Sequence, residues 1–215
     1  MTRTFDNFKG KVIIVTGHTG FKGSWLSIWL AHLGAKVVGV SHSEVSKPSN
    51  FAVSAISTVI EDHRLDIRDT DAIKALVEKV QPDFVFHLAA QALVRPSYEN
   101  PIETMTINAI GTANVLDALR VLNKKVVAVM ITSDKAYDNV EWVWGYRESD
   151  RLGGKDPYSA SKGMAELVIR SYVESFFNDP DSNIRVGITR AGNVIGGGDW
   201  AIDRIVPDCM EAWSF

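Results

Sequence analysis

Tyr158 and Lys162 stand four residues apart, a spacing that places two side chains on the same face of a helix. Asp156 and Pro157 precede them, and these residue types favour the N-cap and the first position of a helix. A phenol with its ordinary pKa of about 10 is a weak base at neutral pH, and a neighbouring ammonium group favours its ionised form. The pair predicts a base that takes the proton of a hydroxyl group. The alternative is a pair of exposed residues on a helix.

A second group of reactive side chains, Ser133, Asp134 and Lys135, follows the apolar run 125–132. A serine hydroxyl at the end of a strand can hydrogen-bond a sugar hydroxyl. Simple hydride transfer needs no further acid and base, whereas elimination of water needs one group to protonate the leaving hydroxyl and another to remove a carbon-bound proton. The adjacent acid and base therefore favour an elimination. The alternative is a solvated charge pair.

A glycine-rich segment with the spacing G-x-x-G-x-x-G joins the apolar run 11–16 to a helical pattern. Glycines at these positions allow a tight turn, a close approach to a diphosphate and close packing of helix on strand. The N-terminus of the helix then offers free N–H groups to the phosphates. The residues expected to bind a dinucleotide cofactor here are Gly17, His18, Thr19, Gly20, Phe21, Lys22 and Gly23.

The choice between NAD and NADP stays open at this point. An acid directly after the second strand would favour NAD, but the run 36–40 is followed by Ser-His-Ser before Glu44. No arginine stands there to bind a 2′-phosphate. Asp66 and Ile67, after the third strand, are expected to contact adenine, with a helix-capping turn as the alternative.

Strand-like and helix-like segments alternate along the chain. Strand patterns cover 11–16, 36–40, 59–65, 83–88, 125–132 and 184–190, and helical patterns cover 25–33, 70–80, 98–122 and 157–177. Alternation of this kind predicts the α/β class, as a Rossmann-like, doubly wound parallel sheet whose ligands bind beyond the carboxyl ends of the strands.

The bulk composition excludes several classes of protein. The chain has 215 residues, 46% of them hydrophobic, and a net charge of −3, which argues against a dedicated nucleic-acid binder. A single cysteine permits no internal disulfide. No apolar run reaches the roughly 18 residues of a membrane span, and the polar N-terminus does not resemble a signal peptide. These features predict a cytoplasmic protein, and no metal site is expected.

Five segments together carry a family resemblance: TGHTGFKGSWL, HLAAQALVRPSYENP, TSDKAYD, YSASK and RAGNVIGGGDW. They resemble the extended short-chain dehydrogenase/reductases of the NAD-dependent epimerase/dehydratase family that act on nucleotide sugars, and most closely the CDP-glucose 4,6-dehydratases. The resemblance runs through nearly the whole chain. It implies bound NAD, CDP-glucose as substrate, a 4-keto-6-deoxy sugar as product, and a place in deoxysugar and lipopolysaccharide O-antigen synthesis. It also implies a homodimer that pairs through the helical segments 98–122 and 157–177.

The resemblance also assigns roles to individual residues. Tyr158, helped by Lys162 and Ser133, would deprotonate the sugar 4-hydroxyl, Lys135 would act as the base at C5, and Asp134 would protonate the departing C6 hydroxyl. Further cofactor contacts are implied for Leu88, Ala89, Ala90, Gln91, Asn108, Thr132, Tyr158 and Lys162. Substrate contacts are expected from Arg95, Asn193 and Arg204, and Trp142, Trp144 and Tyr146 would either form a pocket wall or pack their own loop.

One departure from the family concerns length. Members of this family normally continue into a smaller domain that binds the nucleotide sugar. The expected division is an NAD(P)-binding domain at 1–195 and the start of a truncated substrate-binding region at 196–215, so that cofactor binding survives and turnover is in doubt. Two alternatives stay open: a nucleotide-sugar 4-epimerase, which needs no elimination, and a non-catalytic NAD-binding protein.

Overall fold

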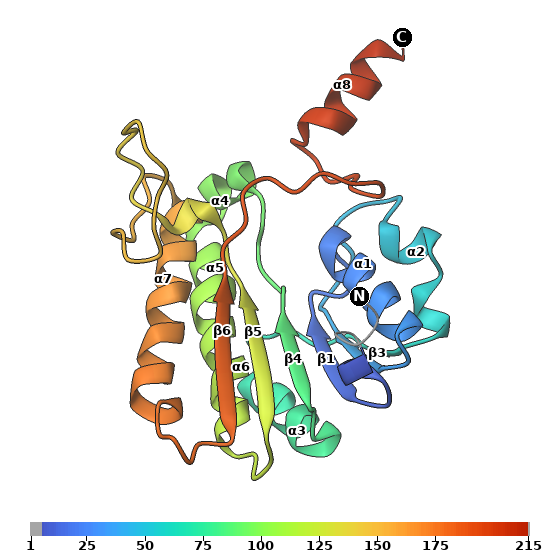
Figure 1. Ribbon diagram of the computed structural model, residues 1–215. Coiled ribbons are helices and arrows are strands. Elements are labelled where there is room, and N and C mark those ends of the chain that lie inside the picture. The colour runs from blue at the N-terminus through green and yellow to red at the C-terminus, as the bar shows by residue number, and fades with distance from the viewer. Residues whose placement is uncertain (1–5, 215) are drawn as a thin grey trace.

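The computed structural model describes residues 6–214, and within them six strands form one parallel sheet in the order β3-β2-β1-β4-β5-β6 (Figure 1). Every neighbouring pair of strands is parallel. The strands are β1 (Val12–Thr16), β2 (Lys36–Val40), β3 (Glu61–His63), β4 (Phe84–His87), β5 (Val126–Ile131) and β6 (Ile184–Thr189). This order, with crossovers on both sides of β1, confirms the predicted doubly wound fold.

Helices cover both faces of the sheet. They are α1 (Phe21–His32), α2 (Asn50–Val53), α3 (Thr70–Val80), α4 (Val94–Glu99), α5 (Pro101–Met105), α6 (Gly111–Arg120), α7 (Pro157–Tyr172) and α8 (Ile205–Trp213). Successive residues of a strand point to opposite faces, so Ile14 packs in the core beneath α3, α6 and α7, whereas Ile13 and Val15 pack with Leu30 of α1.

The first helix differs from its prediction in start and orientation. It begins at Phe21, four residues before the pattern suggested, and Trp25 and Trp29 are about half exposed. Its buried side is made of small residues and one leucine, namely Gly23, Ser24, Ser27 and Leu30. Small side chains let the helix lie close to the sheet. The helical spacing of Trp25 and Trp29 therefore belongs to the outer face of the helix and not to the buried one.

The long helix predicted over 98–122 is interrupted. Helix α4 ends at Glu99, and Asn100 has a non-helical conformation (φ −131°, ψ 64°) because a residue before proline is kept out of the helical region. Pro101 then starts α5. A π-helical turn, η3 (Thr106–Ile110), joins α5 to α6, and a second, η5 (Val173–Phe177), extends α7.

Beyond β6 the chain crosses the carboxyl edge of the sheet toward α1 and then forms α8, which projects away from the sheet (Figure 1). This helix was not expected from the sequence. Among residues 6–214, no helix combines the length and the apolar character that crossing a membrane requires.

Candidate active site

The glycine-rich segment forms the turn between β1 and α1. Gly17 has a left-handed backbone (φ 76°), and a Cβ atom there would lie 2.7 Å from the backbone nitrogen of Ala89. A Cβ atom on Gly23 would lie 2.0 Å from the carbonyl oxygen of Gly17. Gly17 therefore lies so close to the segment after β4, and Gly23 so close to Gly17, that neither position has room for a side chain. The free N–H groups of the first turn of α1 stand at this cradle, which suits a diphosphate.

Two side chains of the loop point into the protein. His18 is fully buried, its Nε2 atom lies 2.8 Å from Asp62, and burial lowers its pKa. Thr19 donates a 2.7 Å hydrogen bond to the carbonyl oxygen of Ser43. These two residues anchor the loop, so their contribution to a bound cofactor would come from the backbone.

The expected adenine contacts lie after β3. The Asp66 carboxylate accepts hydrogen bonds from Nε and Nη2 of Arg68 at 2.9 and 2.6 Å, and these lower its pKa. Ile67 is buried in the core, so only its backbone stays available to a ligand. Helix α3 is capped by Asp69, whose side chain accepts from the N–H of Ala72.

Tyr158 and Lys162 lie on one face of α7, as predicted. Asp156 caps the helix by accepting a 2.9 Å hydrogen bond from the N–H of Ser159. Tyr158 is only 9% exposed and Lys162 only 7%, with the Lys162 Nζ atom 5.8 Å from the centre of the tyrosine ring. The alternative of an exposed pair is therefore wrong.

Burial shifts the pKa of both groups. It lowers the pKa of Lys162 to about 8, with a smaller contribution from the charge of Lys22. Burial raises the pKa of Tyr158, while a hydrogen bond with Ser133 and the charge of Arg204 oppose the rise. At neutral pH the free chain thus holds a neutral phenol beside a mostly protonated lysine.

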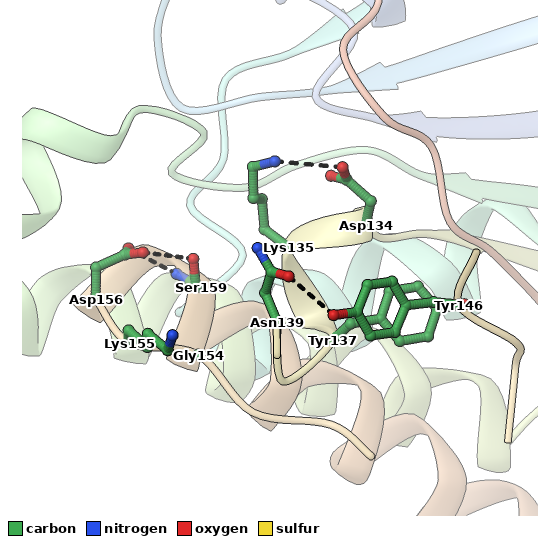
Figure 2. Close-up of a pocket in the computed structure, with 9 residues that line it drawn as sticks. All are labelled: Asp134, Lys135, Tyr137, Asn139, Tyr146, Gly154, Lys155, Asp156 and Ser159. Atoms are coloured by element: carbon green, nitrogen blue, oxygen red, sulfur yellow. Dashed lines mark hydrogen bonds and ion pairs between the residues drawn. The ribbon is translucent and has the colours of Figure 1, made fainter. Parts of the chain in front are cut away.

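Ser133, Asp134 and Lys135 lie directly beyond β5. The Ser133 hydroxyl donates to Asp134 at 3.1 Å and accepts from the N–H of Lys135 at 3.2 Å. The Lys135 Nζ atom lies 3.2 Å from Asp134, in an ion pair whose side chains are 50% and 42% exposed (Figure 2). Both residues line a cavity of about 490 Å³. Its lining consists of Asp134, Lys135, Tyr137, Asn139, Tyr146, Gly154, Lys155, Asp156 and Ser159 (Figure 2).

Four aromatic residues form a continuous stack beside this cavity, which we call the aromatic wall: Tyr137, Trp142, Trp144 and Tyr146. The ring centres are 5.0 Å apart for Tyr137 and Tyr146, 5.2 Å for Tyr146 and Trp142, and 5.7 Å for Trp142 and Trp144. Tyr137 and Tyr146 line the cavity, whereas Trp142 and Trp144 do not and are 40% and 64% exposed. The role of a pocket wall, weighed from the sequence, thus fits Tyr146 but not the two tryptophans.

Asn108 supports the site from within. Its side chain accepts from the N–H of Gln91 at 2.8 Å and donates to the carbonyl of Gln91 at 3.0 Å and to Ser161 at 2.8 Å. It is buried, so it ties the segment after β4 to α7. The neighbouring segment 88–91 lies against the glycine loop through Ala89.

The three expected substrate residues are placed differently. Arg204 pairs with Asp199 at 3.3 Å and lies close enough to Lys22 and Tyr158 to shift the pKa of both. Arg95 is 81% exposed and pairs with Asp203 at 3.0 Å. Asn193 lies exposed on the segment that follows β6. Arg204 therefore lies near Tyr158, whereas Arg95 pairs with Asp203 at the surface.

The family described as GDP-mannose 4,6 dehydratase matches residues 14–183, which is most of the chain. The chain belongs to this family. It is 48% identical over 210 residues to the CDP-glucose 4,6-dehydratase of Salmonella typhimurium, across 96% of this chain and 58% of that protein. It is 30% identical to the GDP-mannose 4,6-dehydratase of Yersinia enterocolitica, across 77% of this chain and 46% of that protein. The chain thus spans about half the length of these dehydratases.

Solved structures of epimerases share the fold. The UDP-glucose 4-epimerase of Thermotoga maritima superposes with a TM-score of 0.80 at 24% identity, over 93% of this chain and 62% of that one. The UDP-glucuronic acid 4-epimerase of Bacillus cereus, solved with UDP-glucuronic acid and NAD, gives 0.78 at 25% identity, over 94% and 63%.

Glu166 also belongs to the site, although no motif of the sequence predicts it. It stands four residues after Lys162 and eight after Tyr158, on the same face of α7, and it is almost fully buried. A charged residue that continues the helical spacing of a catalytic pair was the pattern that could have revealed it.

Proposed function

We propose that this chain carries the cofactor-binding and catalytic part of an NAD-dependent nucleotide-sugar 4,6-dehydratase that acts on CDP-glucose. The observation that carries the proposal is the meeting of two acid–base pairs at one edge of the sheet, Tyr158 with Lys162 and Asp134 with Lys135. The identity to a CDP-glucose 4,6-dehydratase over nearly the whole chain supports the same substrate.

NAD would supply the redox chemistry by accepting a hydride from C4 of the sugar and returning it to C6. The glycine cradle at Gly17–Gly23 suits its diphosphate because a side chain at Gly17 would collide with the neighbouring backbone. Ala89, which packs against this cradle, and Lys162, one helical turn from Tyr158, are further groups expected to contact the cofactor. In the same proposal Asp66 and Ile67 face the adenine.

The first step falls to Tyr158, which takes the proton of the sugar 4-hydroxyl. The Ser133 hydroxyl donates to Asp134 in the free chain and lies close enough to Tyr158 to lower its pKa, so turning this proton toward the phenol would stabilise the phenolate form. Lys162 adds a positive charge on the same face of the helix. In the free chain burial keeps the pKa of Tyr158 raised despite these groups, so the positive ring of bound NAD would supply the further support that the phenolate needs.

The elimination falls to the pair beyond β5. Once C4 is a ketone the proton on C5 is acidic. Transfer of one proton from Lys135 to Asp134 within the pair would leave a neutral amine, which removes the C5 proton, and a carboxylic acid, which protonates the C6 hydroxyl so that it leaves as water and the ion pair is restored. The ion pair between the two side chains keeps both at the mouth of one cavity.

An epimerase is the second candidate, since solved epimerases share this fold. Epimerisation at C4 uses the tyrosine and the cofactor but needs no group to protonate a leaving hydroxyl. The Asp134 and Lys135 pair favours the dehydratase.

Mass spectrometry separates the candidates. Purified chain is incubated with NAD and with CDP-, UDP-, GDP- or dTDP-glucose in parallel. Loss of one water from the CDP sugar alone supports the proposal, whereas a product of unchanged mass with altered sugar configuration supports the epimerase. If no sugar changes while NAD still binds, the assay is repeated with a chain extended to the length of the dehydratase relatives. Failure of the extended chain would refute the proposed reaction.

We also propose a homodimer. Exposed apolar residues follow the outer faces of α5, η3 and α7, including Ile102, Ile110 and Leu167. Sedimentation that detects only monomer at micromolar concentration would refute it.

A further inference from the structure

Glu166 is a buried carboxylate that the proposed reaction does not use directly. It is 2% exposed and lies one helical turn beyond Lys162 on α7. A buried charge is tolerated only when hydrogen bonds and an opposite charge compensate for its lost hydration. Its partners therefore indicate what it holds in place.

Those partners come from the ends of two strands. Arg190, directly after β6, binds both oxygens of the carboxylate through Nε, at 2.7 Å, and Nη2. Thr132, directly after β5, donates its hydroxyl to Glu166 at 2.7 Å. A bidentate arginine fixes orientation as well as distance, so α7 is attached to both strand ends at one point.

Each partner is linked to the segment Ser133–Asp134, either along the chain or through one hydrogen bond. Thr132 precedes Ser133 in the chain. Arg190 precedes Ala191, whose carbonyl oxygen accepts a 3.0 Å hydrogen bond from the N–H of Asp134. The segment Ser133–Asp134 is thus held on both sides by groups bound to Glu166.

Arg190 also contacts the cavity. Its guanidinium carbon lies 4.5 Å from the centre of the Tyr137 ring, the innermost member of the aromatic wall. The same arginine therefore joins the buried carboxylate to the wall through a cation–π contact.

We propose that Glu166 and Arg190 are positioning residues, which align the strand ends carrying Ser133 and Asp134 with Tyr158 on α7. The inference deepens the proposed function and rests on Tyr158 acting as the base. An apolar pair could fill the same space, and such replacements of buried ion pairs are often well tolerated. It would make no hydrogen bond to Thr132, so the two strand ends, still joined to each other by the N–H of Thr132 and the carbonyl of Thr189, could shift together relative to α7.

The test therefore compares the ion pair with an apolar pair that fills the same volume but does not orient the strand ends. The double variant Glu166→Met/Arg190→Leu replaces the pair by apolar side chains of similar size. The control is Glu174→Gln, which breaks an exposed ion pair with Arg170, 2.7 Å long, at the end of the same helix. Each chain is labelled with ¹³C in the tyrosine rings, saturated with NAD, and titrated through the alkaline range by NMR. The Tyr158→Phe variant identifies the Tyr158 resonance.

The double variant is expected to keep a cooperative thermal transition while Tyr158 becomes a weaker acid by about tenfold, because its hydrogen bond with Ser133 is lost or lengthened. The control is expected to leave the Tyr158 titration unchanged. An unchanged titration in a folded double variant would overturn the proposal and leave the pair a purely structural role.

A second variant covers the case in which the double variant does not fold. Glu166→Gln keeps an acceptor for Thr132 and removes the charge that orients Arg190, so a smaller shift in the same direction is expected, and no shift would overturn the proposal. The titration requires no turnover. A chain that fails to dehydrate CDP-glucose would therefore refute the proposed function without deciding the role of the pair.

Discussion

Lys162 places its Nζ atom 5.8 Å from the centre of the Tyr158 ring, and both side chains are buried on one face of α7. The lysine is thus a charge held inside the protein beside a phenol. This charge lowers the stability of the folded protein, because a buried ammonium group loses its hydration.

Because the buried charge is destabilising, we predict that Lys162→Met stabilises the protein near neutral pH. The unfolded lysine binds its proton up to a pKa of 10.5 and the folded one only to about 8. The penalty is therefore full below pH 8, at about 3 kcal/mol, and disappears as the pH rises toward 10.5. Thermal unfolding at a series of pH values should show a gain for Lys162→Met that shrinks with pH. Lys79→Met, on the exposed side of α3, is the control, and an equal loss of stability at every pH would contradict the prediction.

His87 predicts the response to acid. It is buried between the hydroxyls of Thr16, at 2.8 Å, and Thr112, at 3.0 Å, and burial lowers its pKa to about 3. The unfolded imidazole binds a proton below pH 6.5, so stability that is complete above pH 6.5 falls as the pH drops toward 3.

His87→Gln keeps a polar group at this position and does not titrate. We expect it to lose less stability than the parent chain over that pH range, with a difference of up to about 5 kcal/mol, in urea unfolding. The exposed His32→Gln should follow the parent curve. A parallel loss in His87→Gln and the parent chain would show that other groups cause the acid sensitivity.

The glycine loop offers a matched pair of substitutions. Gly17 and Gly10 both have left-handed backbones, at φ 76° and 72°, but a Cβ atom at Gly17 collides with Ala89 whereas one at Gly10 meets nothing within 4 Å. Gly10→Ala should cost about 1–2 kcal/mol from backbone strain alone. Gly17→Ala should cost more and weaken NAD binding at least about tenfold, because the loop must move away from the segment after β4. Calorimetric titration with NAD measures the affinity, and equal effects of the two variants would refute the packing argument.

Lys135→Met separates the two halves of the proposed reaction. The oxidation at C4 should continue, whereas removal of the C5 proton should slow by about 10²- to 10⁴-fold, the usual contribution of a positioned base. Exchange of the C5 hydrogen of CDP-glucose with solvent deuterium, in a chain that turns over, measures this step directly. Lys155→Met, a second lysine of the same cavity, controls for the lost positive charge. Exchange at the parent rate would exclude Lys135 as the base.

The parts of the site that the sequence revealed are those whose partners lie close together in the chain. Tyr158 and Lys162 are one helical turn apart, and the apolar strands of a parallel sheet are continuous runs that need no partner to be recognised. The fold and the glycine loop followed from such local patterns.

The contacts that were missed join distant positions. Glu166 meets Thr132 across 34 residues of sequence and Arg190 across 24. The orientation of α1 was misjudged for a related reason. Only the packing of Gly23 against Gly17 shows why the small residues face the sheet and the tryptophans do not.

The π-helical turn at Thr106–Ile110 has a consequence for insertions and deletions. Such a turn holds one residue more than an α-helical turn, so deleting one residue within it would leave a regular helix and a stable fold. Because the wider turn absorbs the extra residue, the helical segments on its two sides would keep nearly the same orientation, whereas one residue more or less in a regular α-helix would rotate one side by about 100° relative to the other. Asn108 binds Gln91, whereas Asn114, further along, binds the carbonyl oxygen of Ile67. A deletion within the turn should therefore spare both contacts as long as Asn108 is kept, whereas a deletion in the regular helix between Asn108 and Asn114 should break one of them.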